Sequence, residues 1–225
     1  MEEARAYEEL RVGFTAAVSH ELRTPLARLL ALLESASLPD ADTEALLAQA
    51  REQVEEMSEL VDDVLFLSEL ESGREVVALG STAALPVLED VRDRLADSAE
   101  RADVTIRIAA DAEVELPLRR RMLQIIAENL VENSIRYAGP GSTLTLSAGN
   151  GVLTAADDGR GVEEDELPRL FERFYRSDRA RASRGTGLGL AIVKHVVTAA
   201  GGEVEATGGP GHGLTVTCSF MSAPG

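Results

Sequence analysis

Residues 14–32 decide the N-terminal fold, and they read Phe-Thr-Ala-Ala-Val-Ser-His-Glu-Leu-Arg-Thr-Pro-Leu-Ala-Arg-Leu-Leu-Ala-Leu. Apolar side chains recur in this stretch at steps of four and three, at Val18, Leu22, Pro25, Leu29 and Leu32. Such spacing lines up one apolar stripe along a helix. Between residues 2 and 37 the only glycine is Gly13 and the only proline is Pro25, so we expect one helix over most of this range.

A second helix with the same spacing is predicted after a short break. Residues 38–42, Leu-Pro-Asp-Ala-Asp, supply helix breakers and a candidate N-cap. Downstream, the repeat returns at Ala50, Val54, Met57, Val61, Val64 and Ser68. Two helices with one narrow apolar stripe each cannot enclose a core, whereas a second copy of the hairpin would complete a four-helix bundle. We therefore expect a homodimer.

The pattern changes near residue 75, so we place a helical hairpin over 1–75 and a second domain over 76–225. In the second domain the periodicity predicts helices near 83–101, 118–137 and 188–199. Strands are predicted near 75–79, 104–108, 112–114, 144–148, 152–156, 203–206 and 214–220. Strands mixed with helices, ending on a glycine-rich hairpin, indicate an α+β fold in which an α/β sandwich has helices on one face of a mixed sheet.

Composition narrows the range of partners. The 225 residues carry a formal net charge of −17, which argues against nucleic acid as a ligand. The acidity is concentrated in residues 1–75, with 18 Asp and Glu against 6 Lys and Arg. A single cysteine, Cys218, fits a reducing cytoplasm. No apolar run approaches the roughly 18 residues of a membrane span, so we expect membrane attachment only through upstream segments outside this chain.

His20 is predicted to face away from the apolar stripe of its helix. At about 100° per residue, its side chain lies roughly 200° from Val18. An imidazole attacks phosphorus only through an unprotonated nitrogen, and a neighbouring carboxylate can accept or orient the proton on the other nitrogen. Glu21 is placed for that role. A lone exposed histidine is usually only solvated, so the assignment depends on the residues around it.

Those residues, from Phe14 through Val18-Ser-His-Glu-Leu-Arg-Thr-Pro-Leu26, closely resemble the H box of sensor histidine kinases. The resemblance implies that His20 is the phospho-acceptor and that Glu21 is its acid/base. It also implies that Thr24 positions a water for dephosphorylation of the partner, a response-regulator receiver domain.

Four later segments resemble the ATP-binding domain of the same family, in the family's order. The first, Asn129-Leu-Val-Glu-Asn133-Ser-Ile-Arg136-Tyr137, is similar to the N box. Asn129 and Asn133 share a helix face, and amide oxygens suit Mg²⁺ held by ATP phosphates, with Asn133 as the expected metal ligand. Arg136 can contact phosphate and Tyr137 can wall the base or ribose. In gyrase-type ATPases a glutamate replaces Asn129, so we expect this pocket to transfer phosphate rather than hydrolyse ATP.

The second segment, Asp157-Asp-Gly159-Arg-Gly161, is similar to the G1 box, in which the aspartate reads the adenine amino group and the glycines admit the ring. The third, residues 170–176, resembles the F box and opens a stretch over 169–184 with six Arg and two acids. This stretch is a candidate triphosphate clamp, represented by Arg176, and a candidate mobile lid.

The fourth segment resembles the G2 box and leads directly into a helix, so its backbone N–H groups can face phosphate. It comprises Gly185, Thr186, Gly187, Leu188 and Gly189.

Together these resemblances predict a protein-histidine kinase that uses Mg²⁺ and ATP to phosphorylate His20 and then transfers the phosphoryl group to a response-regulator aspartate. Two alternatives stay open at this point: a dimeric scaffold that binds nucleotide without catalysis, and a gyrase-type ATPase. Asn129 and the H-box helix disfavour the ATPase. The presence of every expected catalytic residue type disfavours the scaffold.

Overall fold

The computed structural model describes residues 2–39, 41–71, 80–177 and 185–220, with the side chains of the first helix described from Thr15 onward. Residues group into two compact units, Met1–Phe66 and Leu67–Gly225. The division falls inside the second helix, which ends at Glu71. The boundary predicted near residue 75 and the strand predicted over 75–79 lie outside the described residues.

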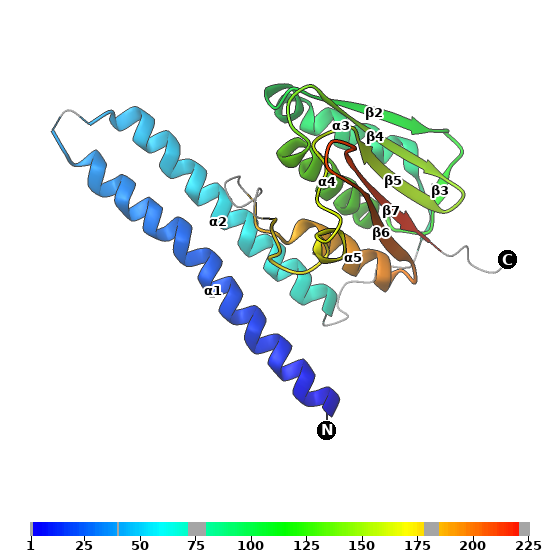
Figure 1. The fold of residues 1–225 in the computed structure, drawn as a ribbon, viewed down its shortest axis with the longest axis horizontal. Helices are drawn as coiled ribbons and strands as arrows, with labels where there is room; N and C mark the ends of the chain where they lie inside the picture. Colours follow the sequence, from blue (N-terminus) through cyan, green and yellow to red (C-terminus); the bar gives the residue numbers. More distant parts are fainter. Residues whose placement is uncertain (1, 40, 72–79, 178–184, 221–225) are drawn as a thin grey trace. The chain divides into compact units, whose positions relative to one another are not determined.

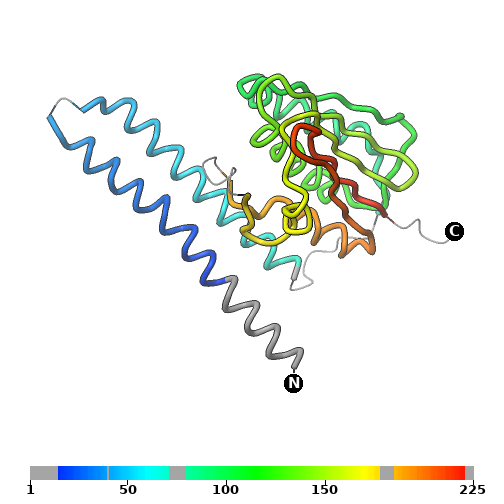
Figure 2. Tube along the Cα trace, viewed as in Figure 1, coloured from blue at the N-terminus to red at the C-terminus, as the bar shows by residue number. Residues whose placement is uncertain are grey.

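The first unit is the predicted helical hairpin. Helix α1 spans Glu2–Ala36 and passes through Pro25, which is buried. Helix α2 spans Thr43–Glu71 and runs antiparallel to α1 (Figure 2). The predicted cap is present, because the Ala45 amide donates to Oδ1 of Asp42 at 3.1 Å.

Apolar side chains of the hairpin form two kinds of row. The stripe predicted on α1 is the less exposed one, whereas the stripe predicted on α2 divides, with Ala50, Met57 and Val64 shielded and Val54 and Val61 exposed. A further exposed row runs along α1. The exposed apolar residues of the two rows, each 43–58% exposed, are Leu26, Leu30 and Leu33 on α1 and Leu47, Val54, Val61 and Leu65 on α2. The single apolar stripe expected on α2 is therefore two rows, one shielded and one exposed.

The second unit is an α/β sandwich (Figure 1). Its five-stranded sheet has the order β2-β4-β5-β7-β6, with β2 parallel to β4 and the other neighbours antiparallel. The strands are β2 (Val104–Ala110), β4 (Ser142–Gly149), β5 (Val152–Asp157), β6 (Glu203–Gly208) and β7 (Leu214–Ser219). Helices α3 (Ala84–Arg101), α4 (Arg120–Tyr137) and α5 (Gly189–Ala199) lie on one face of this sheet (Figure 1).

Strand periodicity explains which sheet face the helices cover. Leu146, Ala155 and Val216 are register partners on β4, β5 and β7, and all three are buried. The neighbours along each strand are mostly threonines on the opposite, partly exposed face. The helix-covered face therefore forms the core, and the site lies where α4 and α5 meet one end of it.

One predicted strand is wrong. Residues 112–114 form a turn, in which the Val114 amide donates to the Asp111 carbonyl at 3.1 Å. The extended pairing comes just after it, where β3 (Glu115–Leu116) meets β1 (Thr82–Ala83) in a separate two-stranded sheet. These three residues lie in the turn, so they do not form the strand that their apolar alternation had suggested. Among the described residues, no helix is long and apolar enough to cross a membrane.

Candidate active site

A cavity of about 210 Å³ opens in the second unit between α4, the loop after β5 and the turn before α5. Short helix η1 (Leu167–Arg169) and the segment after it complete its wall. The lining residues are Asn129, Glu132, Asn133, Arg136, Tyr137, Arg160, Gly161, Val162, Glu166, Leu170, Tyr175, Arg176, Ser177, Gly185, Thr186, Gly187, Gly189, Leu190 and Leu214. Cationic, amide and glycine residues therefore line one cavity.

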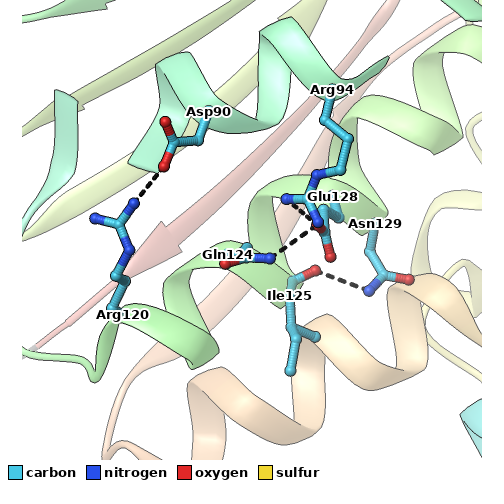
Figure 3. Close-up of polar contacts among 7 residues, drawn as sticks. All are labelled: Asp90, Arg94, Arg120, Gln124, Ile125, Glu128 and Asn129. Carbon is cyan, nitrogen blue, oxygen red and sulfur yellow. Dashed lines mark hydrogen bonds and ion pairs between the residues drawn. The ribbon is translucent and has the colours of Figure 1, made fainter. Parts of the chain in front are cut away.

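Helix α4 contributes one polar face to this cavity. Asn129, Asn133, Arg136 and Tyr137 all line it, as their helical spacing predicts. Nδ2 of Asn129 donates to the Ile125 carbonyl at 2.8 Å (Figure 3). This bond leaves Oδ1 on the side of the α5 N-terminus, where a Cβ on Gly189 would lie 2.7 Å from it. The amide oxygen is thus directed into the site.

Ion pairs hold α4 against α3 on the outer side of the same helix (Figure 3). Arg94 of α3 pairs with Glu128, which also accepts a hydrogen bond from Gln124 at 3.2 Å. Nearer the start of α4, Arg120 pairs with Asp90 of α3. The residue before α4, Arg119, gives no side-chain cap. Cross-helix pairs and buried packing hold the helix instead.

The turn before α5 packs closely on the α4 side chains. A Cβ on Gly185 would lie 2.7 Å from the Tyr137 hydroxyl, and this glycine has φ +139°, so a side chain there is disfavoured twice. The Leu188 amide donates to Oγ1 of Thr186 at 3.2 Å, which fixes the turn. Leu188 itself is fully buried and does not line the cavity. Gly189 and Leu190, in the first turn of α5, do line it, and a helix N-terminus of this kind favours an anion.

The end of β5 holds Asp157 in a defined orientation. Its Oδ1 accepts hydrogen bonds from the amides of Gly159 at 3.0 Å and Leu214 at 3.2 Å. Its Oδ2 accepts one from the Ser134 hydroxyl at 3.2 Å. Asp157 and Gly159 border the cavity through Leu214 and Gly161 without lining it themselves. Gly161 has φ +65°, and a Cβ there would lie 1.9 Å from the Gly209 carbonyl, so only glycine fits.

Three side chains near η1 form a wall that the sequence did not predict. The Tyr175 hydroxyl donates to Oε1 of Glu166 at 3.2 Å, and the guanidinium of Arg169 lies 4.3 Å above the Tyr175 ring. Burial, followed by the charge of Glu166, raises the pKa of Tyr175 above its ordinary value. Arg176 lines the cavity beside this wall, whereas residues 178–184 of the expected clamp and lid lie outside the described residues.

His20 lies on the other unit, on α1. Its side chain is 75% exposed, and Oε1 of Glu21 is 3.7 Å from Nδ1. This is ion-pair range and not a hydrogen bond. Thr24 is exposed one turn further along. The other ring nitrogen, Nε2, is the one away from the Glu21 contact.

The structure therefore divides the predicted residues into three groups. The cavity brings together Asn129, Asn133, Arg136, Tyr137, Gly161, Arg176, Gly185, Thr186, Gly187 and Gly189. Asp157 and Gly159 are part-buried and Leu188 is buried, and none of the three lines the cavity, while His20, Glu21 and Thr24 belong to the hairpin. Sequence reasoning missed Glu132, Arg160 and Glu166 as lining residues. Glu132 could have been found, because it lies between the two asparagines on the same helix face.

The amide oxygens of Asn129 and Asn133 on α4 are suited to a magnesium ion that is bound to phosphates. Amide oxygens are hard ligands of the kind Mg²⁺ takes when it keeps most of its other positions for water and phosphate. No cluster of three or more His, Cys, Asp or Glu side chains suited to a metal occurs in the described part of the chain.

Comparisons with known proteins agree with this geometry. Residues 10–73 match the His Kinase A (phospho-acceptor) domain, and residues 118–224 match the Histidine kinase-, DNA gyrase B-, and HSP90-like ATPase family. The signal transduction histidine-protein kinase BaeS of Escherichia coli (strain K12) is 36% identical over 223 residues, which cover 93% of this chain and 46% of BaeS. The chain spans about half the length of the curated relatives it matches.

Solved structures give the same result. Acinetobacter baumannii histidine kinase AdeS superposes with a TM-score of 0.73 at 26% identity, over 91% of this chain and 98% of AdeS. Full-length ShkA in complex with AMPPNP superposes with a TM-score of 0.62 at 29% identity, over 93% of this chain and 46% of ShkA. A phospho-acceptor hairpin joined to an ATPase-type sandwich defines a histidine-directed phosphotransfer core. The chain belongs to the two-component sensor histidine kinases and corresponds to the catalytic core of such a kinase.

Proposed function

We propose that this chain is an ATP-dependent autokinase that phosphorylates His20 and passes the phosphoryl group to an aspartate of a response-regulator receiver domain. The observation that carries the proposal is the pairing of two features. One is a solvent-exposed imidazole with a carboxylate on its Nδ1 side. The other is a cavity lined by asparagines, arginines and a glycine-rich helix N-terminus.

At His20 the reaction needs a free nitrogen lone pair. With a proton on Nδ1 facing Glu21, Nε2 carries the lone pair and attacks the γ-phosphorus of ATP. A nitrogen–phosphorus bond forms and the bond from phosphorus to the ADP oxygen breaks. The imidazole gains positive charge in this step, and the Glu21 carboxylate stabilises that charge and accepts the Nδ1 proton.

The cavity residues bind and orient the nucleotide. Gly185, Gly187 and the first turn of α5 offer backbone N–H groups to phosphate oxygens. Arg136 and Arg176 add charge-assisted hydrogen bonds. Asn133, supported by Asn129, would hold Mg²⁺, which neutralises phosphate charge when bound. A glutamate at position 129 would activate water, and its absence favours transfer over hydrolysis.

The proposed base site lies at the end of β5. Asp157 accepts the adenine amino group and Tyr137 walls the base or ribose, as the family resemblance implies. ShkA, which is similar over most of this chain, was solved with AMPPNP, an ATP analogue. This supports ATP as the nucleotide.

We also propose a homodimer built on the exposed apolar rows of the hairpin. At about 100° per residue, the exposed row is displaced from the shielded row by roughly 90° on α1 and 65° on α2, in the same rotational sense. Because the helices are antiparallel and face each other, both rows emerge on one side of the hairpin. A second hairpin would cover that side and complete a four-helix bundle. His20 lies about 110° around α1 from the row, so dimerisation leaves it accessible.

Two further assignments follow from the resemblance. Thr24 is proposed to align water for dephosphorylation of the regulator, and Ala27, an exposed small residue below His20, to contribute to regulator docking. Leu26 belongs instead to the exposed row that is assigned to the dimer. We place the chain in the cytoplasm, where ATP and receiver domains are found.

The test follows the γ-phosphoryl group of labelled ATP. The proposal predicts acid-labile, base-stable label on the protein, lost in His20→Gln while ATP affinity is unchanged, because acceptor and pocket belong to different units. Release of all the label as inorganic phosphate would identify a gyrase-type ATPase. Nucleotide binding with neither label nor phosphate release would identify a scaffold.

A further inference from the structure

Ser134 interrupts an otherwise apolar face of α4. The buried residues of this helix are Met122, Leu123, Ile126, Ala127, Leu130, Val131 and Ser134. Ser134 continues the apolar repeat of this helix and is 3% exposed. A hydroxyl buried this deeply needs a hydrogen-bond partner, so its presence in the stripe calls for an explanation.

The partner is the carboxylate of Asp157, on a strand 23 residues away. The Ser134 hydroxyl donates to Oδ2 at 3.2 Å. The other oxygen, Oδ1, is held by the backbone amides of Gly159 and Leu214. Donors from α4, the loop after β5 and the start of β7 thus fix both oxygens, and the plane of the carboxylate cannot turn without breaking one of them.

This arrangement determines what Asp157 can recognise. An ionised carboxylate only accepts hydrogen bonds, so a ligand atom opposite it must be a donor. Oδ1 already accepts two bonds, whereas Oδ2 accepts only the one from Ser134 among the bonds formed by the described residues. The spare acceptor capacity therefore lies on the oxygen whose direction Ser134 sets.

The Ser134 hydroxyl connects two segments that reach the cavity. Ser134 follows Asn133 directly on α4, and Asn133 lines the cavity. Leu214, which donates to Asp157, lines it as well. The Ser134 to Asp157 bond therefore joins α4 to the end of β5 beside the cavity.

We infer that Ser134 is a positioning residue for base selection, which holds Asp157 so that Oδ2 accepts the N–H of a purine 6-amino group. This inference rests on the proposed function, since it assumes that Asp157 reads the base of a bound nucleotide. Ser134 does not touch the nucleotide itself. Its effect is confined to the selectivity for the 6-amino group.

The test compares ATP with purine riboside triphosphate, which has hydrogen in place of the 6-amino group. Dissociation constants for both are measured by calorimetry on the unmodified chain and on Ser134→Ala. We expect Ser134→Ala to weaken ATP about tenfold, the scale of one hydrogen bond to a charged group. Binding of purine riboside triphosphate should change less than about twofold, because it has no amino group to be read.

The matched control is Ser142→Ala. Ser142 is likewise buried in this unit, but its hydroxyl donates to the Gly139 carbonyl at 2.7 Å and not to Asp157. It should leave the ratio of the two affinities unchanged. Thermal unfolding without nucleotide checks the fold of each variant. If Ser134→Ala does not fold, Ser134→Cys, of similar size and a weaker donor, replaces it with the same expectation.

Equal weakening of both triphosphates in Ser134→Ala would overturn the inference, because a purely structural role moves both affinities together. An unchanged ATP affinity would overturn it as well. Asp157→Asn separates this failure from failure of the proposed function. If Asp157→Asn weakens ATP and Ser134→Ala does not, only the role of Ser134 is wrong. If neither variant weakens ATP, the assignment of Asp157 to the base is wrong too.

Discussion

At the scale of single residues, the chemistry of His20 depends on one close neighbour and on open solvent. Glu21 lies on the Nδ1 side at 3.7 Å, and the imidazole is otherwise exposed. The approach to Nε2 is therefore unobstructed, and a rotation of either side chain could shorten the contact when charge develops on the ring. Thr24 lies one turn along the helix from His20 and is also exposed.

We predict that Thr24→Ala loses dephosphorylation of the phosphorylated regulator while autophosphorylation of His20 persists. The hydroxyl is needed only to align a water, which is a matter of geometry. Loss of phosphatase activity should be about tenfold or more, the scale of one positioned hydrogen bond. Both activities are measured on the same preparation, and Thr24→Ser, which keeps the hydroxyl, is the control. Equal loss of both activities would indicate a structural role.

Cys218 gives a second prediction at this scale. It is fully buried in β7, and burial raises the pKa of its thiol to about 12. In the folded unit the thiol should resist alkylation near pH 8, because the thiolate is the reactive form and is almost absent. It should react only on unfolding. Since the pKa is raised in the folded state, the thiol should also reduce stability as pH rises from about 9 toward 12, and Cys218→Ala should remove that contribution. Rapid alkylation of the native protein would contradict this prediction.

A site residue could be predicted from the sequence when the residues it acts with lie on the same helix. Asn129, Asn133 and Arg136 share a helix face that the sequence alone specifies. The Ser134 to Asp157 bond joins a helix to a strand, and helical spacing says nothing about it. Glu166 and Tyr175 meet across a segment of turns that includes Phe174 at φ +61°. Such a left-handed residue with a bulky side chain is not marked in the sequence.

At the scale of elements, the exposed row of the hairpin and the hydrogen bond in the cavity wall can each be tested by a single substitution. The exposed row of α2 is the clearest case. Val61 is 43% exposed in the single chain and lies in the centre of the face that we propose as the dimer interface.

We predict that Val61→Asp dissociates the dimer. It would place an unpaired charge in the bundle core, at a cost of several kcal/mol. Ala48→Asp, at an exposed position of α2 outside the row, is the matched control and should leave the dimer intact. Sedimentation velocity measures both. A stable monomer for the unmodified chain would contradict the dimer itself.

The wall near η1 gives the second prediction at the scale of elements. Tyr175→Phe keeps the ring beneath Arg169 and removes only the hydrogen bond to Glu166. ATP affinity should fall about threefold to tenfold, because the wall of the cavity loses the Tyr175 to Glu166 hydrogen bond, which is worth about 1 kcal/mol. Glu172→Gln, an exposed residue outside the cavity lining, should leave affinity unchanged. An unchanged affinity in Tyr175→Phe would show that this bond does not support the site.

Most elements were predictable, and the exceptions have local causes. Helices α3, α4 and α5 were expected within two residues of their observed starts and ends, because their apolar periodicity is strong. The strand predicted over 112–114 was wrong because the sequence of a tight turn and that of a short strand look alike over three residues. The division of the α2 stripe was also missed, since a heptad repeat does not say which of its positions face the neighbouring helix.

At the scale of the whole molecule, the separation of acceptor and pocket is the central feature. His20 belongs to Met1–Phe66 and the cavity to Leu67–Gly225. The proposed transfer therefore requires the two units to bring Nε2 of His20 in line with the γ-phosphorus of ATP. The change of pattern near residue 75 predicted two domains, although residues 72–79 lie outside the described part of the chain.

The most direct test of the central claim is to locate the phosphoryl group after incubation with ATP and Mg²⁺. Tandem mass spectrometry of peptides prepared at alkaline pH, where phosphohistidine survives, identifies the modified residue. We predict phosphate on His20 alone. Phosphate on Ser19 or Thr24, stable to acid, or an unmodified peptide from a chain that binds ATP, would contradict the account.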